Sequence, residues 1–541
     1  MSLGIGTGGT QSLPAFSRDF LTPAHAAGLL ILAFAAIVAA WPFGLTSDYL
    51  NHLARNHIEA QIWFDPVLQR YYDLSLDVIP DLTMDMLVPW LSHLTGIYAA
   101  GAVTIWLAFI LPPLAGLLIA RNVHGRMTWL SLAGFLFAFN ENMQWGFVNF
   151  VASTGLALLG FALWMRIDPR WLRTLVFAPF GVFLAFNHAL GFLLFGYLVL
   201  LWELACYAHG ERGGVRDFLA RLATKDALAM VPGLTVLALA TGGAEQLTHT
   251  GIISFDVFRN ILTIGAGAAF FDPLLGFAVT LGFLVAVAIG IVFGLLRLDS
   301  RMAWICAGML ALVIAMPQSI FGIWGLHFRY PAVFAILVAA SVEFAGVRTG
   351  RRAFAFAAIG SVLLVAVFAN AVHHLSKTDT RTRELRSILA HLPVGALLLP
   401  ARHDSADDPF ALHSAALAVI ERSAFVPNLF TNTSPVDVVP AMRRLHMPQA
   451  RPLSEEQLVS AIDLDPPAAE NGFWSKGYFN DWPNHWDHLI YFRTAPNQHL
   501  DVENLCPVAE RANLVLYGIG KNRCNEPGEL TVSFTLRPTL E

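Results

Sequence analysis

The chain alternates between long apolar runs and short polar connections from residue 24 to residue 372, which predicts membrane-spanning helices. An apolar run of about 20 residues crosses a bilayer as a helix, because lipid offers the backbone no partner and a helix pairs its own polar groups. About eleven runs fit this pattern, two of them short, at residues 24–44, 98–120, 127–140, 147–165, 171–186, 189–208, 226–243, 274–296, 302–320, 330–346 and 353–372.

The charged residues divide the chain into two predicted domains. Only 13% of the 541 residues are charged, against about 25% in soluble proteins, and 56% are hydrophobic. Residues 376–541 carry 35 of the 73 charges, while residues 1–375 carry the other 38. The sequence therefore predicts a membrane domain, 1–375, and a soluble domain, 376–541. The formal charge of −5 excludes a nucleic-acid partner, because no basic excess exists to neutralise phosphates.

The arginines and lysines of residues 1–375 predict how the chain is threaded, because short cytoplasmic loops collect positive charge. With the N-terminus inside, 15 of these 19 residues face the cytoplasm, and the outer loops hold only Arg55, Arg70, Arg259 and Arg329. We therefore predict a multi-pass membrane protein with its N-terminus in the cytoplasm and residues 376–541 outside. The first run is expected to be a span and not a cleaved signal peptide, because no small-residue cleavage pattern follows it.

The predicted outer domain shows a mixed α/β pattern. Residues 392–399 and 488–492 are typical of strands, and residues 409–423 and 454–462 of helices. Cys506 and Cys524 both fall in this domain, where an oxidising compartment allows a disulfide, although two unpaired thiols are the alternative.

Polar residues gather at the predicted outer ends of the spans. The first external loop, residues 46–96, begins with Ser-Asp-Tyr-Leu-Asn-His-Leu-Ala-Arg at 47–55 and predicts two amphipathic helices on the outer surface, the second starting at Pro80-Asp81. Other outer connections contain Glu141 and Asn187-His188, and a late one reads His327-Phe328-Arg329-Tyr330. The inner loops have no such clusters, so we expect any chemistry on the outer side.

This layout resembles the GT-C superfamily of integral-membrane glycosyltransferases. The shared features are a cytoplasmic N-terminus, an acidic residue just after the first span, a long first external loop, about ten further spans and an external C-terminal domain. The resemblance implies a polyprenyl-phosphate-linked sugar as donor, Asp48 as the catalytic carboxylate and Arg329 as the ligand of the donor phosphate. No second acidic residue adjoins Asp48 and the outer domain lacks an aromatic sequon-reading motif, which disfavours an oligosaccharyltransferase acting on asparagine.

The chemistry of the residues is compatible with these roles. A carboxylate such as Asp48 accepts the proton of an attacking hydroxyl, and a direct displacement at the anomeric carbon inverts it. The guanidinium of Arg329 offers parallel donors to a leaving phosphate, with His327 as helper. The remaining candidates for binding substrate are His52, Arg55, Glu141, Asn187, His188 and Tyr330.

Each candidate also has a structural alternative. The alternative for Asp48 is that it only caps the start of a helix, because an acidic residue at a helix N-terminus interacts favourably with the helix dipole. Arg329 can anchor a helix end at the interface, and His52 and Arg55 can form a solvated helix face. No cofactor is expected. A divalent metal held by Asp48 and Glu141 is the less favoured alternative, since the histidine spacings do not match a metal site.

Three functions compete at this stage. The favoured one is an inverting glycosyltransferase that moves a sugar from a polyprenyl-phosphate donor to a glycan, lipid or protein acceptor on the outer face. The alternatives are a transporter or flippase of a lipid-linked glycan, and a non-catalytic membrane scaffold. Ionisable residues lie at the span ends and not at the midplane, and no internal repeat is present, which disfavours a transporter.

Overall fold

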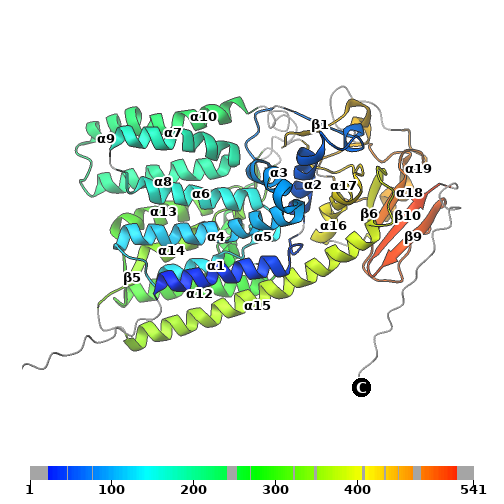
Figure 1. Ribbon diagram of the computed structural model, residues 1–541. Helices are drawn as coiled ribbons and strands as arrows, with labels where there is room; N and C mark the ends of the chain where they lie inside the picture. Colours follow the sequence, from blue (N-terminus) through cyan, green and yellow to red (C-terminus); the bar gives the residue numbers. More distant parts are fainter. Residues whose placement is uncertain are drawn as a thin grey trace, which may run out of the picture.

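The computed structural model shows a bundle of apolar helices joined to a small α/β domain (Figure 1). It describes residues 22–45, 47–75, 77–167, 169–240, 253–268, 270–320, 323–346, 350–404, 408–431, 434–448, 450–466 and 477–520. The helices of the bundle are α1 (Pro23–Ala40), α4 (Ile97–His124), α6 (Val148–Trp164), α7 (Arg170–Asn187), α8 (Ala189–Ala208), α10 (Ala227–Leu239), α12 (Pro273–Val292), α13 (Ser300–Ala315), α14 (Pro331–Ser341) and α15 (Gly350–Leu389).

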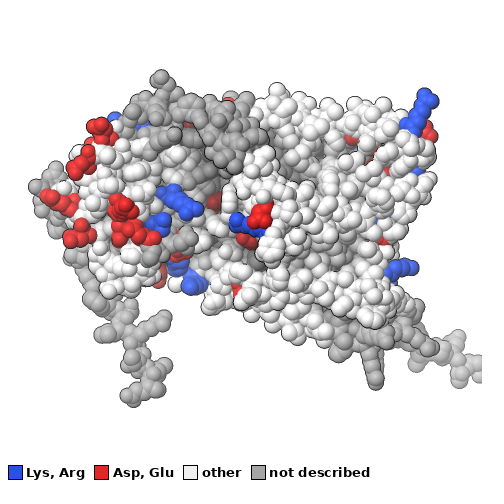
Figure 2. Space-filling view, turned by 180° about the vertical axis from the view of Figure 1, so that it is seen from behind, with Lys and Arg blue, Asp and Glu red and all other residues white. Residues whose placement is uncertain are grey.

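The membrane character of the bundle follows from the length and composition of its helices. Within the described residues, five helices are long and apolar enough to cross a membrane, or six if the bent pair Val215–Thr224 and Ala227–Leu239 is one span. Four shorter apolar helices accompany them. Figure 2 shows the charges over the small domain and at the far end of the bundle, with a mostly uncharged band between. The predicted count of about eleven spans stays a prediction.

One predicted span, residues 127–140, folds differently. Its central part is the 3₁₀ helix η2 (Leu130–Phe137), whose 8 residues cover about 16 Å at 2 Å per residue, half of a bilayer core. An aromatic cluster surrounds its end. Phe34 of α1 lies 4.9 Å from both Phe139 and Phe368, measured between ring centroids, and 5.5 Å from Phe109. The segment is therefore a short, mostly buried helix that packs against α1, α4 and α15.

The C-terminal domain contains a four-stranded sheet in the order β6-β8-β10-β9. Its strands are β6 (Leu398–Arg402), β8 (His488–Phe492), β10 (Leu514–Ile519) and β9 (Leu505–Arg511); β6 pairs parallel to β8, and the other pairs are antiparallel. Short helices flank it, namely α16 (Pro409–His413), α17 (Leu417–Arg422), α18 (Glu455–Ser460) and α19 (Trp482–His485). Cys506 lies on β9, and its predicted partner Cys524 lies outside the described residues.

The predicted boundary between the two domains is bridged in two places. Helix α15 has 40 residues and runs without a break from the bundle past residue 375 into the C-terminal domain (Figure 1). The first external loop supplies β1 (Tyr72–Leu74), which pairs antiparallel with β7 (Val436–Val438). A continuous helix and a shared ladder couple the domain to the bundle, because bending either one breaks backbone hydrogen bonds.

Helix α2 (Asp48–Gln61) corrects the prediction of a helix on the outer surface. Asn51, His52, Arg55 and Asn56 on its polar face are all buried. The Asn51 side-chain amide donates to the Asn428 carbonyl oxygen at 2.9 Å and accepts from the Phe430 amide at 2.8 Å. Asn51 therefore finds its partners in the C-terminal domain and not in water. Helix α3 (Thr83–Thr95) does keep an apolar outer face, with Trp90 78% and Leu94 85% exposed.

A buried ion pair fastens α2 to α3. The Arg55 guanidinium donates to both carboxylate oxygens of Asp85, at 2.8 and 2.6 Å, and neither side chain is more than 3% exposed. Two parallel charge-assisted bonds fix the guanidinium plane, which sets the angle between the two helices. The first external loop is thereby held rigidly at the junction of bundle and domain.

Arg55→Ala is expected to lower the free energy of unfolding by about 3–5 kcal/mol, because it leaves Asp85 buried without its counter-charge. Denaturation in mixed micelles measures this, with the exposed Arg70→Ala as the matched control. The double variant Arg55→Ala, Asp85→Ala should lose less than the sum of the single variants. Additive losses would show that the pair does not hold the helices together.

Candidate active site

The candidate site lies where the start of α2 meets two loops of the bundle and one helix of the C-terminal domain. The Asp48 amide donates to the Trp145 carbonyl oxygen at 3.3 Å, just after α5 (Glu141–Gln144). The Asn142 side chain donates to the carbonyl oxygens of Phe328 and Arg329, at 3.2 and 3.3 Å. These bonds bring residues 48, 145 and 329 to one place.

Asp48 is the first residue of α2 and follows a backbone position that non-glycine residues rarely adopt. Ser47 has φ +55° and ψ −125° and is buried, and its hydroxyl donates to Asp48 Oδ1 at 3.2 Å. Such strain persists only where the surroundings enforce it, and it is common at functional sites. Here it turns the chain from α1 into α2 and places the carboxyl at the junction, with 22% of its side chain exposed.

The surroundings of Asp48 change its acidity. Burial raises the pKa of the carboxyl from 3.8 to about 7, although the Ser47 hydroxyl and the charges of Arg329 and Arg55 oppose the shift. His413 Nε2, at the end of α16, lies 3.7 Å from Asp48 Oδ1. Burial lowers the pKa of His413 to about 3, so this histidine is neutral and does not form a charged pair with Asp48.

Asp81 is a second carboxyl of the site, which the sequence analysis used only as a helix start. The Asn149 amide donates to its Oδ1 at 3.0 Å, and His188 Nε2 lies 3.9 Å from the same oxygen. Burial raises the pKa of Asp81 to about 7, against the opposing charge of Arg55. No sign of this role is visible in the sequence, because an acidic residue there is expected to start the helix, whereas in the structure Asp81 lies two residues before α3 and does not cap it.

Arg329 is a buried cation in an aromatic cage. Its guanidinium carbon lies 3.8 Å from the ring centroid of Phe147 and 4.9 Å from that of Phe150, and the residue is 8% exposed. Its Nε is buried and has no hydrogen-bond partner, and no ion pair within 4 Å is found for it in the described part of the chain. The charges of Asp48 and Asp81 nevertheless act on it, which places all three groups in one site.

His188 and Tyr330 join the same site. The Tyr330 hydroxyl donates to the Leu190 carbonyl oxygen at 3.0 Å, which ties the start of α14 to the start of α8. His188 accepts the Leu190 amide at its Nδ1 and stacks edge-on against Phe150. Burial and the charge of Arg329 lower the pKa of His188 to about 3, so its ring is neutral beside Asp81.

Three of the predicted binding residues have structural contacts near the site. They are His52, Arg55 and Asn187. Arg55 is occupied by Asp85, and His52 packs against Phe430 with a ring-centroid distance of 5.6 Å. Burial and the neighbouring Arg55 hold the pKa of His52 well below its usual range. The backbone oxygen of Asn187 accepts from the Leu82 amide, and its side chain donates to the Phe183 carbonyl oxygen. These contacts orient helix ends.

Glu141 and His327 belong to a neighbouring group. Burial raises the pKa of Glu141, and the charge of Arg259 opposes this. His327 packs edge-on against Phe328, and its buried Nδ1 has no partner. Arg259 also acts on His327, so these two residues share a different cation from Asp48 and Asp81. In the described residues no three His, Cys, Asp or Glu side chains are grouped to hold a metal ion, and metal dependence stays a prediction.

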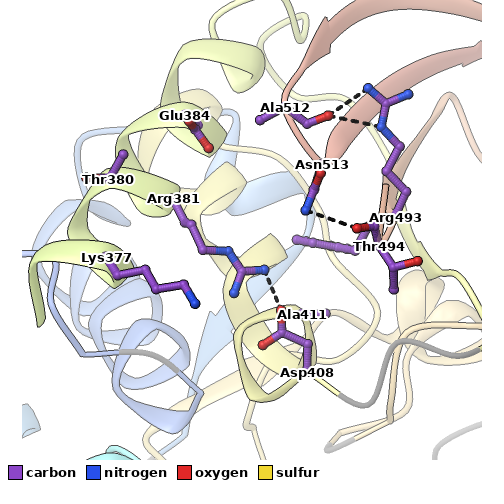
Figure 3. A pocket seen from close by; sticks show the side chains of 11 residues that line it. Lys377, Thr380, Arg381, Glu384, Asp408, Ala411, Arg493, Thr494, Ala512 and Asn513 are labelled. Atoms are coloured by element: carbon purple, nitrogen blue, oxygen red, sulfur yellow. Dashed lines mark hydrogen bonds and ion pairs between the residues drawn. The ribbon is translucent and has the colours of Figure 1, made fainter. Parts of the chain in front are cut away.

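A cavity of about 600 Å³ lies between α15 and the C-terminal domain (Figure 3). One face of α15 lines it with Lys377, Thr380, Arg381 and Glu384. Phe492 at the end of β8 and the loop residues Thr494 and Asn513 line the other side. The Arg381 guanidinium pairs with Asp408, which also caps α16 through a 3.0 Å bond from the Phe410 amide. Its lining holds three cations, Lys377, Arg381 and Arg493, and two carboxylates, Glu384 and Asp408, so hydrogen-bond donors and acceptors face the space together.

Comparison with known proteins adds a likeness of shape. No family model and no curated protein sequence matches the chain. Two similar solved structures are crystal structures of ArnT from Cupriavidus metallidurans, one in the apo state and one bound to undecaprenyl phosphate. Each is 12% identical to this chain, with TM-scores of 0.48 and 0.49, and each match covers 91% of this chain and 98% of ArnT. A TM-score below 0.5 assigns no function, so the function has to come from the residues of the site.

The raised pKa of Asp48 predicts a pH-dependent gain in stability for Asp48→Asn. As pH rises from 3.8 to about 7, the unfolded chain loses its proton while the folded protein keeps it, so the folded protein loses stability. Asparagine avoids this loss. The variant should therefore exceed the parent in thermal midpoint at about pH 8 and gain little at about pH 4. The exposed Asp73→Asn is the matched control, and an equal gain at both pH values contradicts the assignment.

Proposed function

We propose that this protein is an inverting glycosyltransferase of the GT-C type, which moves a sugar from a polyprenyl phosphate to an acceptor hydroxyl. The observation that carries the proposal is Arg329, a buried guanidinium for which no ion pair is found among the described residues, beside two carboxyls of raised pKa. A buried charge without a counter-charge is costly unless a ligand supplies one. The ligand that fits is an anion, and a phosphate matches the fork of donors of a guanidinium.

The aromatic cage supports a role in holding a leaving group. Phe147 and Phe150 cover the face of the Arg329 guanidinium, so in this proposal an anion binds at its N–H groups. Cation–π contact and packing fix the plane of the guanidinium without neutralising it. When the bond between the anomeric carbon and the phosphate oxygen breaks, the phosphate takes the electron pair, and Arg329 stabilises the growing negative charge.

Asp48 is the general base in this proposal. The acceptor oxygen attacks the anomeric carbon, its proton passes to Asp48, and the lipid phosphate leaves from the opposite side, which inverts the centre. A base works best with a pKa near the working pH, and the pKa of about 7 meets this condition. Ser47 and the neutral His413 fix the carboxyl, and its exposed fifth lets an acceptor approach.

Partial protonation of Asp48 and Asp81 reduces the negative charge that a donor phosphate meets when it binds. Asp48 and Asp81 both have a pKa of about 7, so near neutral pH the pair carries less than its full negative charge. This leaves the positive charge of Arg329 available to an incoming phosphate. After the donor has bound, deprotonation of Asp48 prepares the attack.

We also propose an acceptor and a cellular location. Ala411 of α16 lines the cavity beside α15, and His413, the last residue of that helix, lies 3.7 Å from Asp48; the mixed donors and acceptors of the cavity fit the hydroxyl groups of a glycan. We place the site at the periplasmic face of a bacterial inner membrane, with the N-terminus in the cytoplasm, on the basis of the arginine distribution.

Arg329→Gln is expected to weaken the binding of undecaprenyl phosphate at least 10-fold, because a hydrogen bond to a charged group contributes about 1.5–3 kcal/mol. Titration of the purified protein with this lipid, followed by native mass spectrometry, measures the change. The matched control is Arg259→Gln, an exposed arginine of another outer loop, which should bind as the parent does. If the parent, Arg329→Gln and Arg259→Gln bind undecaprenyl phosphate with equal affinity, Arg329 does not bind the phosphate.

Asp48→Asn is expected to reduce sugar transfer at least about 100-fold while undecaprenyl phosphate still binds, since proton transfer contributes about 10²–10⁴-fold. The assay offers a panel of undecaprenyl-phosphate-linked hexoses and pentoses with a lipid extract of the host as acceptor, and mass spectrometry detects the products. Asp73→Asn serves as the control. Full transfer by Asp48→Asn together with loss in Asp81→Asn would assign the base to Asp81. If the parent protein binds the lipid but transfers no sugar, the result favours the alternative functions of a transporter or a scaffold.

A further inference from the structure

A second cavity, of about 340 Å³, lies at the opposite end of the helix bundle from Asp48. Helix α4 begins beside α3 and its 28 residues rise about 42 Å, at 1.5 Å per residue, to the end that carries Arg121 and Asn122. The ends of α6 and α8 and the start of α13 complete the cavity. Its lining residues are Arg121, Asn122, Gly125, Met165, Arg166, Trp202 and Arg301.

The charge of this cavity is strongly positive. Three of its seven lining residues are arginines, and none is acidic. Arg301 lies 3.5 Å from Glu211, and no ion pair of Arg121 or Arg166 is found in the described part of the chain. Three guanidinium groups around one small space repel one another, so an anion that enters it gains from all three.

The arginines are held in place. Asn122 joins α4 to α6, because its amide donates to the Ala162 carbonyl oxygen at 2.6 Å while its own oxygen accepts from Arg166 Nε at 2.5 Å. Arg301 lies over the ring of Trp202, with 5.2 Å between the guanidinium carbon and the ring centroid. Two of the three cations are therefore positioned before any ligand arrives, which reduces the entropy lost on binding.

We propose that this cavity binds the phosphate of an anionic phospholipid. It lies at the ends of apolar helices, which is the level of lipid headgroups, and its lining includes Met165 and Trp202. Leu163, the last residue but one of α6, is 44% exposed and offers an apolar surface for an acyl chain near this end of the bundle. Basic pockets between helices at the cytoplasmic surface suit acidic lipids. The site is separate from Asp48 and Arg329 and does not rest on the proposed sugar transfer.

The alternative is that these arginines serve only to orient the chain in the membrane. Orientation requires positive charge near the helix ends, whereas lipid binding requires guanidinium groups around this particular space. The same end of the bundle offers a matched comparison. Arg126 and Arg297 are 74% exposed, lie outside the cavity lining and pair with Glu343.

The test is native mass spectrometry of the full-length protein titrated with phosphatidylglycerol or phosphatidylcholine. The parent should retain phosphatidylglycerol and bind phosphatidylcholine at least 10-fold more weakly. The variant Arg121→Gln, Arg166→Gln should lose at least 10-fold in affinity for phosphatidylglycerol, and the control Arg126→Gln, Arg297→Gln should keep the parental value. If the first variant does not fold, Arg121→Lys, Arg166→Lys keeps the charge, and it should still lose affinity because it lacks the bidentate fork.

Three results overturn the proposal. The first is equal retention of the two lipids by the parent, and the second is an equal loss in the cavity variant and the control, which means that general charge binds the lipid. The third is that glycerol 3-phosphate without lipid competes at the same concentration as phosphatidylglycerol, which assigns the site to a soluble anion. Binding of undecaprenyl phosphate at Arg329 is measured separately, so failure here leaves that function untouched.

Discussion

The structure depends on how buried charge is balanced where water is excluded. At the junction of bundle and domain the protein buries two arginines, and it treats them in opposite ways. The Arg55 guanidinium donates hydrogen bonds to both carboxylate oxygens of Asp85 and serves to hold the two helices together. The Arg329 guanidinium packs against two aromatic rings and forms no ion pair among the described residues. The first arrangement fixes α2 and α3, and the second leaves a cation for a ligand to neutralise.

The same exclusion of water sets the protonation of the neighbouring groups. Burial works against charge, so it raises the pKa of Asp48 and Asp81 and lowers that of His188 and His413. Near neutral pH the site holds neutral histidines, partly protonated carboxyls and one permanent cation. A site of this composition attracts an anion and can then take up a proton, and a phosphate-releasing transfer to a hydroxyl needs both.

The sequence predicted the architecture better than the site. Long apolar runs identify α1, α4, α8 and α12 because lipid demands continuous helices. Residues 127–140 form a short buried 3₁₀ helix where a span was expected, because a buried apolar segment inside the bundle has the composition of a span. Asp48 and Arg329 stand out in the sequence because each adjoins a predicted span, and their roles stay predictions. Asp81, Phe147 and His413 could not be assigned to the site, because only the folded chain brings the first loop, α6 and α16 together.

The two ends of the bundle use arginine for different physical purposes. At the end that carries Asp48, burial confines Arg329 to one orientation, so its charge selects a ligand by geometry. At the other end, Arg121 and Arg166 are exposed, and their charges are screened by salt and water. Specific binding there needs several guanidinium groups around one space, as Asn122 arranges for Arg166. A single buried cation and a group of exposed ones are therefore two different ways to present positive charge, and the depth of burial determines which one each end can use.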